Sequence, residues 1–230
     1  MSKPTNKHKV IAAIIQNVHK KDWECIVDCC KEKAINSHLL QRNGILENVS
    51  VNGHLIEYKQ KDPFSWKADS PPFEMKRIGI KKALSLSLFC KVHDNLIFKE
   101  IEIHPLDLDL YRVHLLLSYR VVCAEIRKKQ INVEQFSRFI NAESLKGEIG
   151  LERLKRFKEG NELGIIDLKR YKNIFEDELK NESSRFTFKV YKYTFLDIYG
   201  AAVFTTFDNL VTDLNQEMPL NSIFIYCHPR

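Results

Sequence analysis

The chain has 230 residues, of which 44% are hydrophobic and 29% are charged, with six cysteines and a formal net charge of +6. These proportions are ordinary for a soluble globular protein of one large domain or two small ones, and they argue against a disulfide scaffold. No apolar run approaches the roughly 18 residues that cross a bilayer, and no signal peptide is evident, so we expect a cytoplasmic protein with no membrane partner.

The positive charge is unevenly distributed. Residues 1–100 contain 17 Lys and Arg against 11 Asp and Glu, whereas residues 101–230 contain 19 of each. A basic field over the first hundred residues suits a polyanionic partner, with DNA or RNA as the first candidate. The alternative is a moderately basic surface that contacts only solvent.

Hydrophobic spacing predicts short elements in the first part of the chain. They are a helix at 8–21, strands at 23–27 and 34–38, a helical stretch at 39–48 and, after an Asn52-Gly53 turn signal, a strand at 54–58. Residues 60–76 contain three prolines and form the main predicted loop. Loops of this length inside compact domains are often functional.

The second part of the chain is predicted to change from helices to strands. The elements are a strand at 84–88, a helix opening near Asp94, the strongest helix at 107–129, a charged helix at 144–182 with interruptions at Gly160 and Gly164, and strands at 185–193, 201–207 and 222–226. The chain ends a few residues after the last of these strands, which fits either a natural end or a truncated sheet.

Two pairs of soft ligands, Cys25-x4-Cys30 and Cys90-x2-His93, are separated by 59 residues. Each pair has the spacing of a knuckle that holds one side of a tetrahedral ion, and together they form a Cys3His set typical of structural Zn²⁺. Cys29 is predicted to be a spare thiol, and Cys123 and Cys227 are predicted to be core residues. The alternative is that the four residues are unpaired core side chains.

The predicted fold is therefore α+β. It comprises an N-terminal helix (1–22), a zinc-stapled treble-clef or ββα-like module (23–103), a helical region (104–182) and a C-terminal β-rich segment (183–230).

The segment with the two ligand pairs resembles known proteins. Residues 25–38, the tripeptide 52–54 and residues 89–98 resemble a family of poorly characterised bacterial proteins with Cys-x4-Cys, Ser-His and Phe-Cys-x2-His-Asp blocks in this order. This resemblance covers about residues 23–130. More distantly, residues 25–100 are similar to HNH endonucleases with a zinc-stapled ββα core.

The HNH resemblance implies roles for three further residues. His38 would be the general base that activates water, Asn52 would orient it, and Asp94 would bind a catalytic Mg²⁺ or Mn²⁺ ion. The sequence departs from the HNH pattern at Ser37, at Asp94 and in the 37 residues between Asn52 and Cys90. The alternative roles of His38 are a core histidine or a zinc ligand in place of His93.

A group of basic residues precedes the second ligand pair, at Lys76, Arg77, Lys81 and Lys82. They are candidate contacts to nucleic-acid phosphates, or else a solvated strand edge. His54 is expected to be structural or at the surface.

Three functions follow from these patterns. The first is metal-dependent hydrolysis of nucleic-acid phosphodiesters at His38. The second is a non-catalytic module in which zinc stabilises the fold and the basic face binds nucleic acid or a protein. The third is a partner or dimer surface on the central helices, with zinc as scaffold.

Overall fold

The computed structural model describes residues 6–61, 63–65, 67–103, 106–147, 150–191, 199–205 and 222–227. Its α-helices are α1 (Asn6–His19), α2 (Lys91–Phe98), α3 (Tyr111–Asn141) and α4 (Leu151–Asn181). Its strands are β1 (Asn36–His38), β2 (His54–Gln60), β3 (Phe73–Gly79), β4 (Ser85–Ser87), β5 (Gly200–Thr205) and β6 (Ser222–Cys227). Short helical turns are η1 (Arg42–Leu46), η2 (Pro63–Ser65), η3 (Ile80–Lys82), η4 (Lys99–Ile101) and η5 (Glu143–Leu145). This mixture confirms the predicted α+β class.

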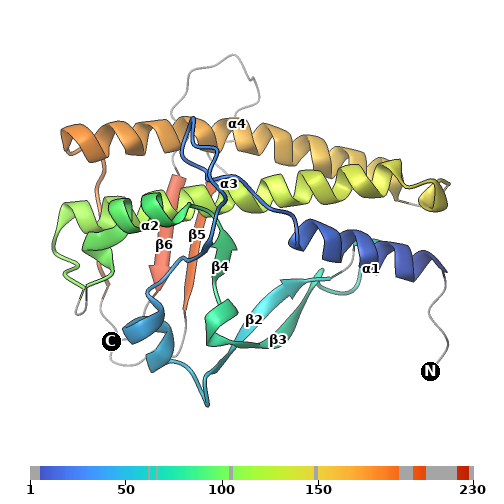
Figure 1. The fold of residues 1–230 in the computed structure, drawn as a ribbon, viewed down its shortest axis with the longest axis horizontal. Coiled ribbons are helices and arrows are strands. Elements are labelled where there is room, and N and C mark those ends of the chain that lie inside the picture. The colour runs from blue at the N-terminus through green and yellow to red at the C-terminus, as the bar shows by residue number, and fades with distance from the viewer. Residues whose placement is uncertain are drawn as a thin grey trace.

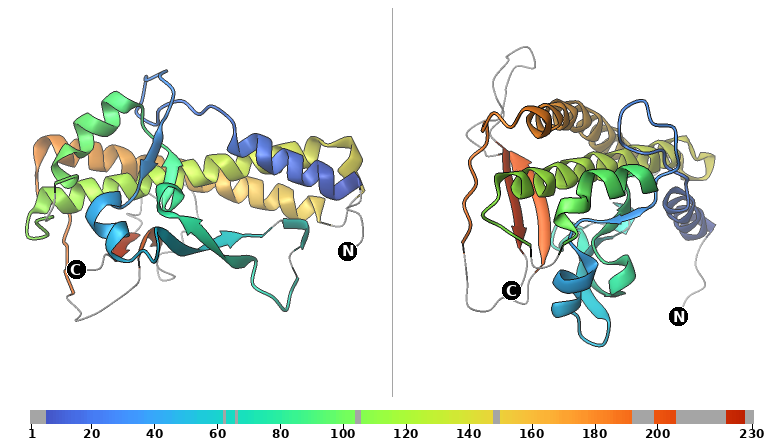
Figure 2. Two further views of the ribbon diagram at one scale, coloured as in Figure 1. Left: turned by 60° about the horizontal axis from the view of Figure 1, so that its bottom comes forward. Right: turned by 60° about the vertical axis from the view of Figure 1, so that its left-hand side comes forward.

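The two long helices α3 and α4 lie side by side along the length of the molecule, and α1 packs near one end of α3 (Figures 1 and 2). The strands form three separate antiparallel ribbons, β1–β4, β2–β3 and β5–β6. The β1–β4 ribbon joins segments on either side of residues 39–84, and β5 packs on α3. The elements that carry the ligand pairs lie together beside the α3–α4 hairpin.

The central part of α3 is buried on all sides, as its apolar composition indicates. The helix begins at Tyr111 and continues to Asn141, well beyond the predicted end at residue 129. Its last turns bury Phe136 and Phe139, which share a second core with Ile11 of α1. Packing against α1 therefore explains the greater length.

The predicted interruptions of the second long helix are wrong, because α4 runs without a break through Gly160 and Gly164. A glycine inside a helix costs only about 1 kcal/mol, which tertiary packing can offset. At Gly164 an added Cβ would lie 2.9 Å from Cε of Lys129 on α3. The absent side chain leaves room for the Lys129 stem between the two helices.

The predicted strand at 185–193 is wrong for residues 185–191, which form no strand, while 192 and 193 lie outside the described residues. The alternating aromatic residues of this segment pack on helices. The Phe186 ring stacks on Phe175 of α4 at 4.5 Å between centroids, and the Phe188 ring stacks on His114 of α3 at 4.7 Å. Within 183–230, the strands in the described residues are β5 and β6, which pair as one ribbon.

Other predicted boundaries shift by a few residues. The stretch at 39–48 contains one π-helical turn, η1. The long loop narrows to residues 61–72, because β2 and β3 both extend into it. The Asn52-Gly53 turn is confirmed. Both residues have positive φ angles, 51° and 69°, and Val51 pairs with His54 across the turn. Such angles favour glycine and asparagine.

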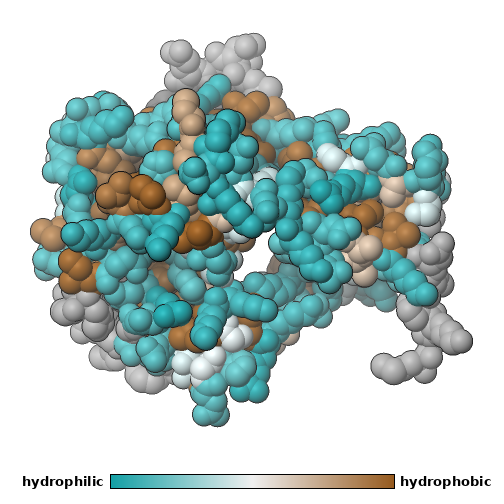
Figure 3. Space-filling model, in the orientation of Figure 1, coloured by the Kyte–Doolittle hydropathy of each residue, from teal (hydrophilic) through white to brown (hydrophobic). Residues whose placement is uncertain are grey.

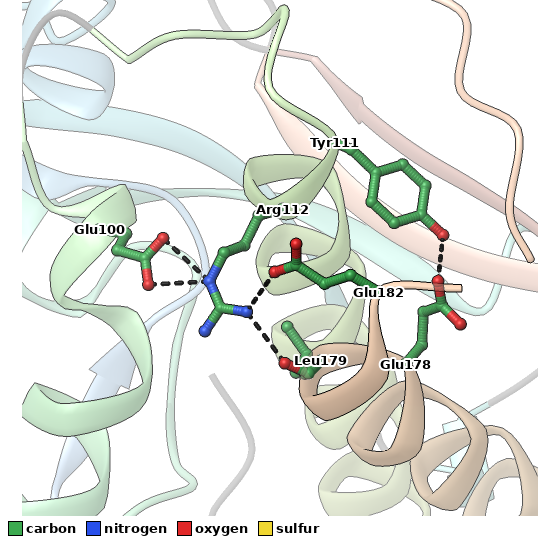
Figure 4. A network of polar contacts seen from close by, with 6 residues as sticks. All are labelled: Glu100, Tyr111, Arg112, Glu178, Leu179 and Glu182. Atoms are coloured by element: carbon green, nitrogen blue, oxygen red, sulfur yellow. Dashed lines mark hydrogen bonds and ion pairs between the residues drawn. The ribbon is translucent and has the colours of Figure 1, made fainter. Parts of the chain in front are cut away.

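Arg112 near the start of α3 connects three elements (Figure 4). Its Nε donates to both carboxylate oxygens of Glu100 in η4, at 2.9 and 3.0 Å. Its Nη1 donates to the carbonyl of Leu179 and to Glu182, at 2.9 and 2.8 Å. A guanidinium has several donors in a fixed plane, so one side chain can fix the end of α2 to both long helices.

An aromatic group connects α2 with α3 in the main core. Phe89, Phe98 and Tyr119 contact one another, with ring centroids 4.8 to 6.3 Å apart. The buried guanidinium of Arg120 lies 4.1 Å from the Phe98 ring centre and donates to Glu102 at 2.7 Å. The segment that ends in the second ligand pair is thus packed directly on α3.

Candidate metal centre

The first ligand pair lies in a tight turn of backbone. The predicted strand at 23–27 is reduced to one bridge, between Glu24 and Lys33, and Cys25 N–H donates to the carbonyl of Glu32 at 2.8 Å. Cys30 N–H donates back to the carbonyl of Val27 at 3.2 Å. The chain reverses between Cys25 and Cys30, so both thiols lie on the same side of the turn.

The second pair lies at the start of α2. Cys90 is the N-cap residue, and its Sγ accepts from the backbone N–H of His93 at 3.5 Å. Backbone hydrogen bonds join this segment to the first turn: Ile26 N–H donates to the carbonyl of Leu88 at 2.9 Å, and Ile35 N–H to that of Phe89 at 2.7 Å. These contacts bring the two distant pairs together.

The four candidate ligand atoms all lie within 4.8 Å of one another. Nδ1 of His93 is 3.4 Å from Sγ of Cys25 and 3.3 Å from Sγ of Cys90, and the Sγ atoms of Cys30 and Cys90 are 4.0 Å apart. A tetrahedron with zinc–sulfur bonds of about 2.3 Å and zinc–nitrogen bonds of about 2.0 Å has edges of roughly 3.5 to 3.8 Å. The three individual distances are close to these edges, so the group could hold a metal ion.

The thiols differ in acidity before metal binds. Burial raises the pKa of Cys25 to about 11, whereas the backbone N–H of His93 lowers the pKa of Cys90. Metal ligation requires thiolates, so binding at this centre would release protons and strengthen with rising pH.

Two further cysteines, Cys29 and Cys123, lie outside the group. Cys29 is exposed, with a φ of 64°, and its neighbour Cys30 is the one that lies in the group that could hold a metal ion. Cys123 is buried in α3, and burial raises its pKa to about 12. The side chain of Cys227 lies outside the described residues.

Arg127 of α3 contacts the two residues that precede Cys25. Its Nη2 donates to the carbonyl of Glu24 at 2.5 Å, and its guanidinium lies 4.8 Å from the centre of the Trp23 ring. Burial lowers the pKa of Arg127 to about 10, so it remains charged at neutral pH. Three thiolates around a divalent ion would have a net charge of −1, which this buried cation would offset.

Lys172 of α4 supports the loop between Cys25 and Cys30. Its side chain is 3% exposed, and its Nζ lies 3.0 Å from Asp28 in that loop and 2.8 Å from Glu176. Burial acts to lower the pKa of Lys172, but the hydrogen bonds to Glu176 and Asp28 outweigh this effect and raise it. The ammonium group therefore stays charged and holds the loop against α4.

Replacement Lys172→Met is expected to lower the free energy of unfolding by about 1.5–3 kcal/mol, because two charge-assisted hydrogen bonds are lost. The pKa of Lys172 is raised in the folded state, so this contribution is complete below the unfolded pKa of about 10.4 and is lost above it. Urea titrations at pH 7 measure the loss. The control Lys169→Met, at an exposed position of α4, should change stability by less than about 0.5 kcal/mol. Equal losses in both variants would contradict the assignment.

Comparison of the chain with protein-family models, with curated proteins and with solved structures finds no match. Among the described residues, no helix is long and apolar enough to cross a membrane.

His38 lies at the end of β1, opposite Ser85 of β4. Its Nε2 is 3.3 Å from the carbonyl oxygen of Ile80, which can only accept a hydrogen bond, so Nε2 holds the proton and Nδ1 keeps a lone pair. Burial lowers the pKa of His38, so the imidazole is neutral at pH 7. A neutral, oriented imidazole is the form that a general base requires.

The other two predicted catalytic residues occupy different places. Asn52 is exposed in the turn before β2. Ile80 links this turn to His38: its N–H donates to the carbonyl of Gly53 at 3.0 Å, and its own carbonyl oxygen lies 3.3 Å from Nε2 of His38. Asp94 lies in the first turn of α2. Its Oδ1 is buried, as is Oγ of Ser37 on β1, and neither atom has a hydrogen-bond partner within the described residues.

The basic residues lie on β3 and η3, and all are exposed. Lys76 pairs with Glu74 at 2.8 Å. Within the described ranges, Arg77, Lys81 and Lys82 have no acidic partner.

Sequence reasoning missed the residues that act on these sites from α3, from α4 and from the end of η4. Arg127 and Lys172 support the first pair, and Glu102 and Arg120 lie close enough to His38 to act on its charge. For the basic residues among them the sequence did contain a signal, which was a single cation inside an apolar part of a helical pattern. A cation buried at such a position requires a specific partner.

Proposed function

We propose that Cys25, Cys30, Cys90 and His93 bind one structural Zn²⁺ ion that closes a treble-clef module. The order of elements supports this: a knuckle turn, then the antiparallel pair β1–β4, then a helix that begins at the second ligand pair. Four protein ligands leave no open position for substrate, so this ion stabilises the fold and takes no part in chemistry.

The proposed activity is hydrolysis of nucleic-acid phosphodiesters with His38 as general base. The observation that carries it is the position of His38 at the end of β1 in a β–β–α unit, with Nε2 held by Ile80 and Nδ1 left to accept a proton. In the proposed step Nδ1 takes a proton from water, the water oxygen bonds to phosphorus, and the bond to the leaving oxygen breaks. Mg²⁺ or Mn²⁺, held by Asp94 and the substrate, would stabilise charge on the phosphate.

The second candidate is a non-catalytic nucleic-acid-binding module. It is favoured by one observation: in the described part of the chain, the Cys3His set is the one group of three or more His, Cys, Asp or Glu residues that could hold a metal. A catalytic ion near His38 would therefore have fewer than three such protein ligands among the described residues.

Cleavage assays with plasmid DNA and with RNA, in Mg²⁺ and in Mn²⁺, test the activity. His38→Ala is expected to lower the cleavage rate by about 10²- to 10⁴-fold without loss of zinc, because only the proton acceptor is removed. His19→Ala is the control, since His19 is exposed at the end of α1 and should leave the rate unchanged. If zinc-loaded wild type binds nucleic acid but cleaves none, hydrolysis is excluded and the non-catalytic binding module is the function.

The pH dependence of cleavage gives an independent check. Since burial lowers the pKa of His38 below its usual value of 6.5, the base stays neutral to lower pH than a free histidine. The acid limb of the rate profile should therefore have its midpoint below 6.5. A midpoint above 6.5 would argue that another group is the base.

A further inference from the structure

The hairpin of β2 and β3 presents an exposed face of directly opposed residues, which project to the same side of an antiparallel ribbon. We call it the hairpin face, and its apolar and basic members are Ile56, Tyr58, Phe73, Met75 and Arg77, beside His54, Gln60 and Gly79. The four apolar side chains are 57%, 70%, 46% and 66% exposed, in that order. In the space-filling view, an opening separates the hairpin from the helices above it (Figure 3). This is an unusually apolar surface for a strand pair in contact with water.

The opposite side of the hairpin holds it in place. Leu55 is buried in a small core with Leu40 and Ala83. Glu57 is also buried, and it accepts a hydrogen bond from the backbone N–H of Leu84 at 2.5 Å. Residues alternate between the two sides of a strand, so these contacts turn the hairpin face outward.

The aromatic residues of the hairpin face form a small platform. The Tyr58 and Phe73 rings meet edge to face, with centroids 5.7 Å apart. Each ring therefore supports the other while most of the Tyr58 surface stays free. Rigid, exposed aromatic rings offer stacking surface to planar ligands at low entropic cost.

The charged residue of the two strands that lies on the hairpin face is a cation, Arg77. Both acidic residues of the two strands, Glu57 and Glu74, alternate with hairpin-face residues and so project to the opposite side. Arg77 lies on the hairpin face, and Lys81 and Lys82 follow it in η3. None of these three cations has an acidic partner in the described parts of the chain. The surface thus combines unneutralised positive charge with exposed aromatic rings.

We propose that the hairpin face binds single-stranded nucleic acid, with unpaired bases stacked on Tyr58 and Phe73 and phosphates at Arg77, Lys81 and Lys82. This inference rests on the proposed nucleic-acid function and specifies its substrate. A duplex hides the faces of its bases, so it could use the cations but not the rings. A protein partner would use the apolar surface but has no need of three unpaired cations beside it.

The test is fluorescence anisotropy with a labelled 20-nucleotide oligothymidylate and a duplex of the same length, at several salt concentrations in EDTA-free buffer without Mg²⁺. Wild type should bind the single strand more tightly. Tyr58→Ala should weaken that binding by about 5- to 150-fold and leave the salt dependence unchanged, because one stacked base is lost. Arg77→Gln should reduce the slope of log affinity against log salt by about 0.7. Tyr191→Ala is the matched control, since Tyr191 is 73% exposed and lies outside the hairpin.

The outcomes separate this inference from the proposed function. Equal binding of single strand and duplex, together with an unaffected Tyr58→Ala variant, would overturn the inference and leave nucleic-acid binding intact. No binding of either oligonucleotide by zinc-loaded wild type would overturn both. Capture of a protein by wild type but not by Tyr58→Ala, without oligonucleotide binding, would replace the nucleic acid by a protein partner.

Discussion

Removal of the proposed zinc ion is expected to unfold the module around β1, β4 and α2. Structural zinc contributes on the order of 10–16 kcal/mol of binding free energy, which equals or exceeds the whole stability of a typical domain. A chelator should therefore abolish the cooperative melting of this part of the chain, and Cys30→Ser should act like the chelator. Thermal melting followed by circular dichroism, with zinc quantified in each sample, measures the effect.

The neighbouring thiol provides the control for this experiment. Cys29 is exposed and lies outside the ligand group, so Cys29→Ser should retain one zinc ion and change stability by less than about 0.5 kcal/mol. A melting curve that EDTA does not change would exclude a structural metal. Similar behaviour of the Cys29 and Cys30 variants would show that the wrong thiol has been assigned.

Truncation of Phe98 is expected to have the second largest effect. The side chain is fully buried between Phe89, Tyr119 and the guanidinium of Arg120, so Phe98→Ala leaves a cavity at the contact between α2 and α3. Such replacements cost about 3–5 kcal/mol. Because α2 also carries His93, the variant should bind zinc more weakly.

Urea unfolding of zinc-loaded protein measures this cost. Leu96→Ala on the same helix is the control, since Leu96 is 74% exposed and its loss should change stability by less than about 0.5 kcal/mol. If both variants lose the same stability, α2 is not packed on α3 as described.

The group that could hold a metal was predictable because its signal is local. Two short spacings of soft ligands each define half of a site, and adjacent thiols such as Cys29 and Cys30 cannot both serve the same half. The α+β class and the helix predicted at 107–129, which overlaps most of α3, followed from hydrophobic periodicity in the same way.

The failures share a physical cause, which is packing between segments distant in sequence. Gly160 and Gly164 suggested a broken helix, yet the contact of α4 with α3 keeps it whole. Phe186 and Phe188 alternate as in a strand, but the surfaces that they cover belong to helices. The roles of Arg127 and Lys172 depend on which loops reach α3 and α4, and no local pattern contains that information.

The two strands of the β1–β4 ribbon meet where the chain leaves the module and where it returns, with Leu39 N–H donating to the carbonyl of Leu84 at 2.8 Å. The chain between Leu39 and Leu84, which includes the β2–β3 hairpin, is therefore a long insertion whose two ends lie side by side. A longer insertion costs little, since each doubling of its length adds only about 0.6 kcal/mol of loop-closure free energy. The segment between Leu39 and Leu84 could therefore change in length while the β1–β4 ribbon and the long helices stay as they are.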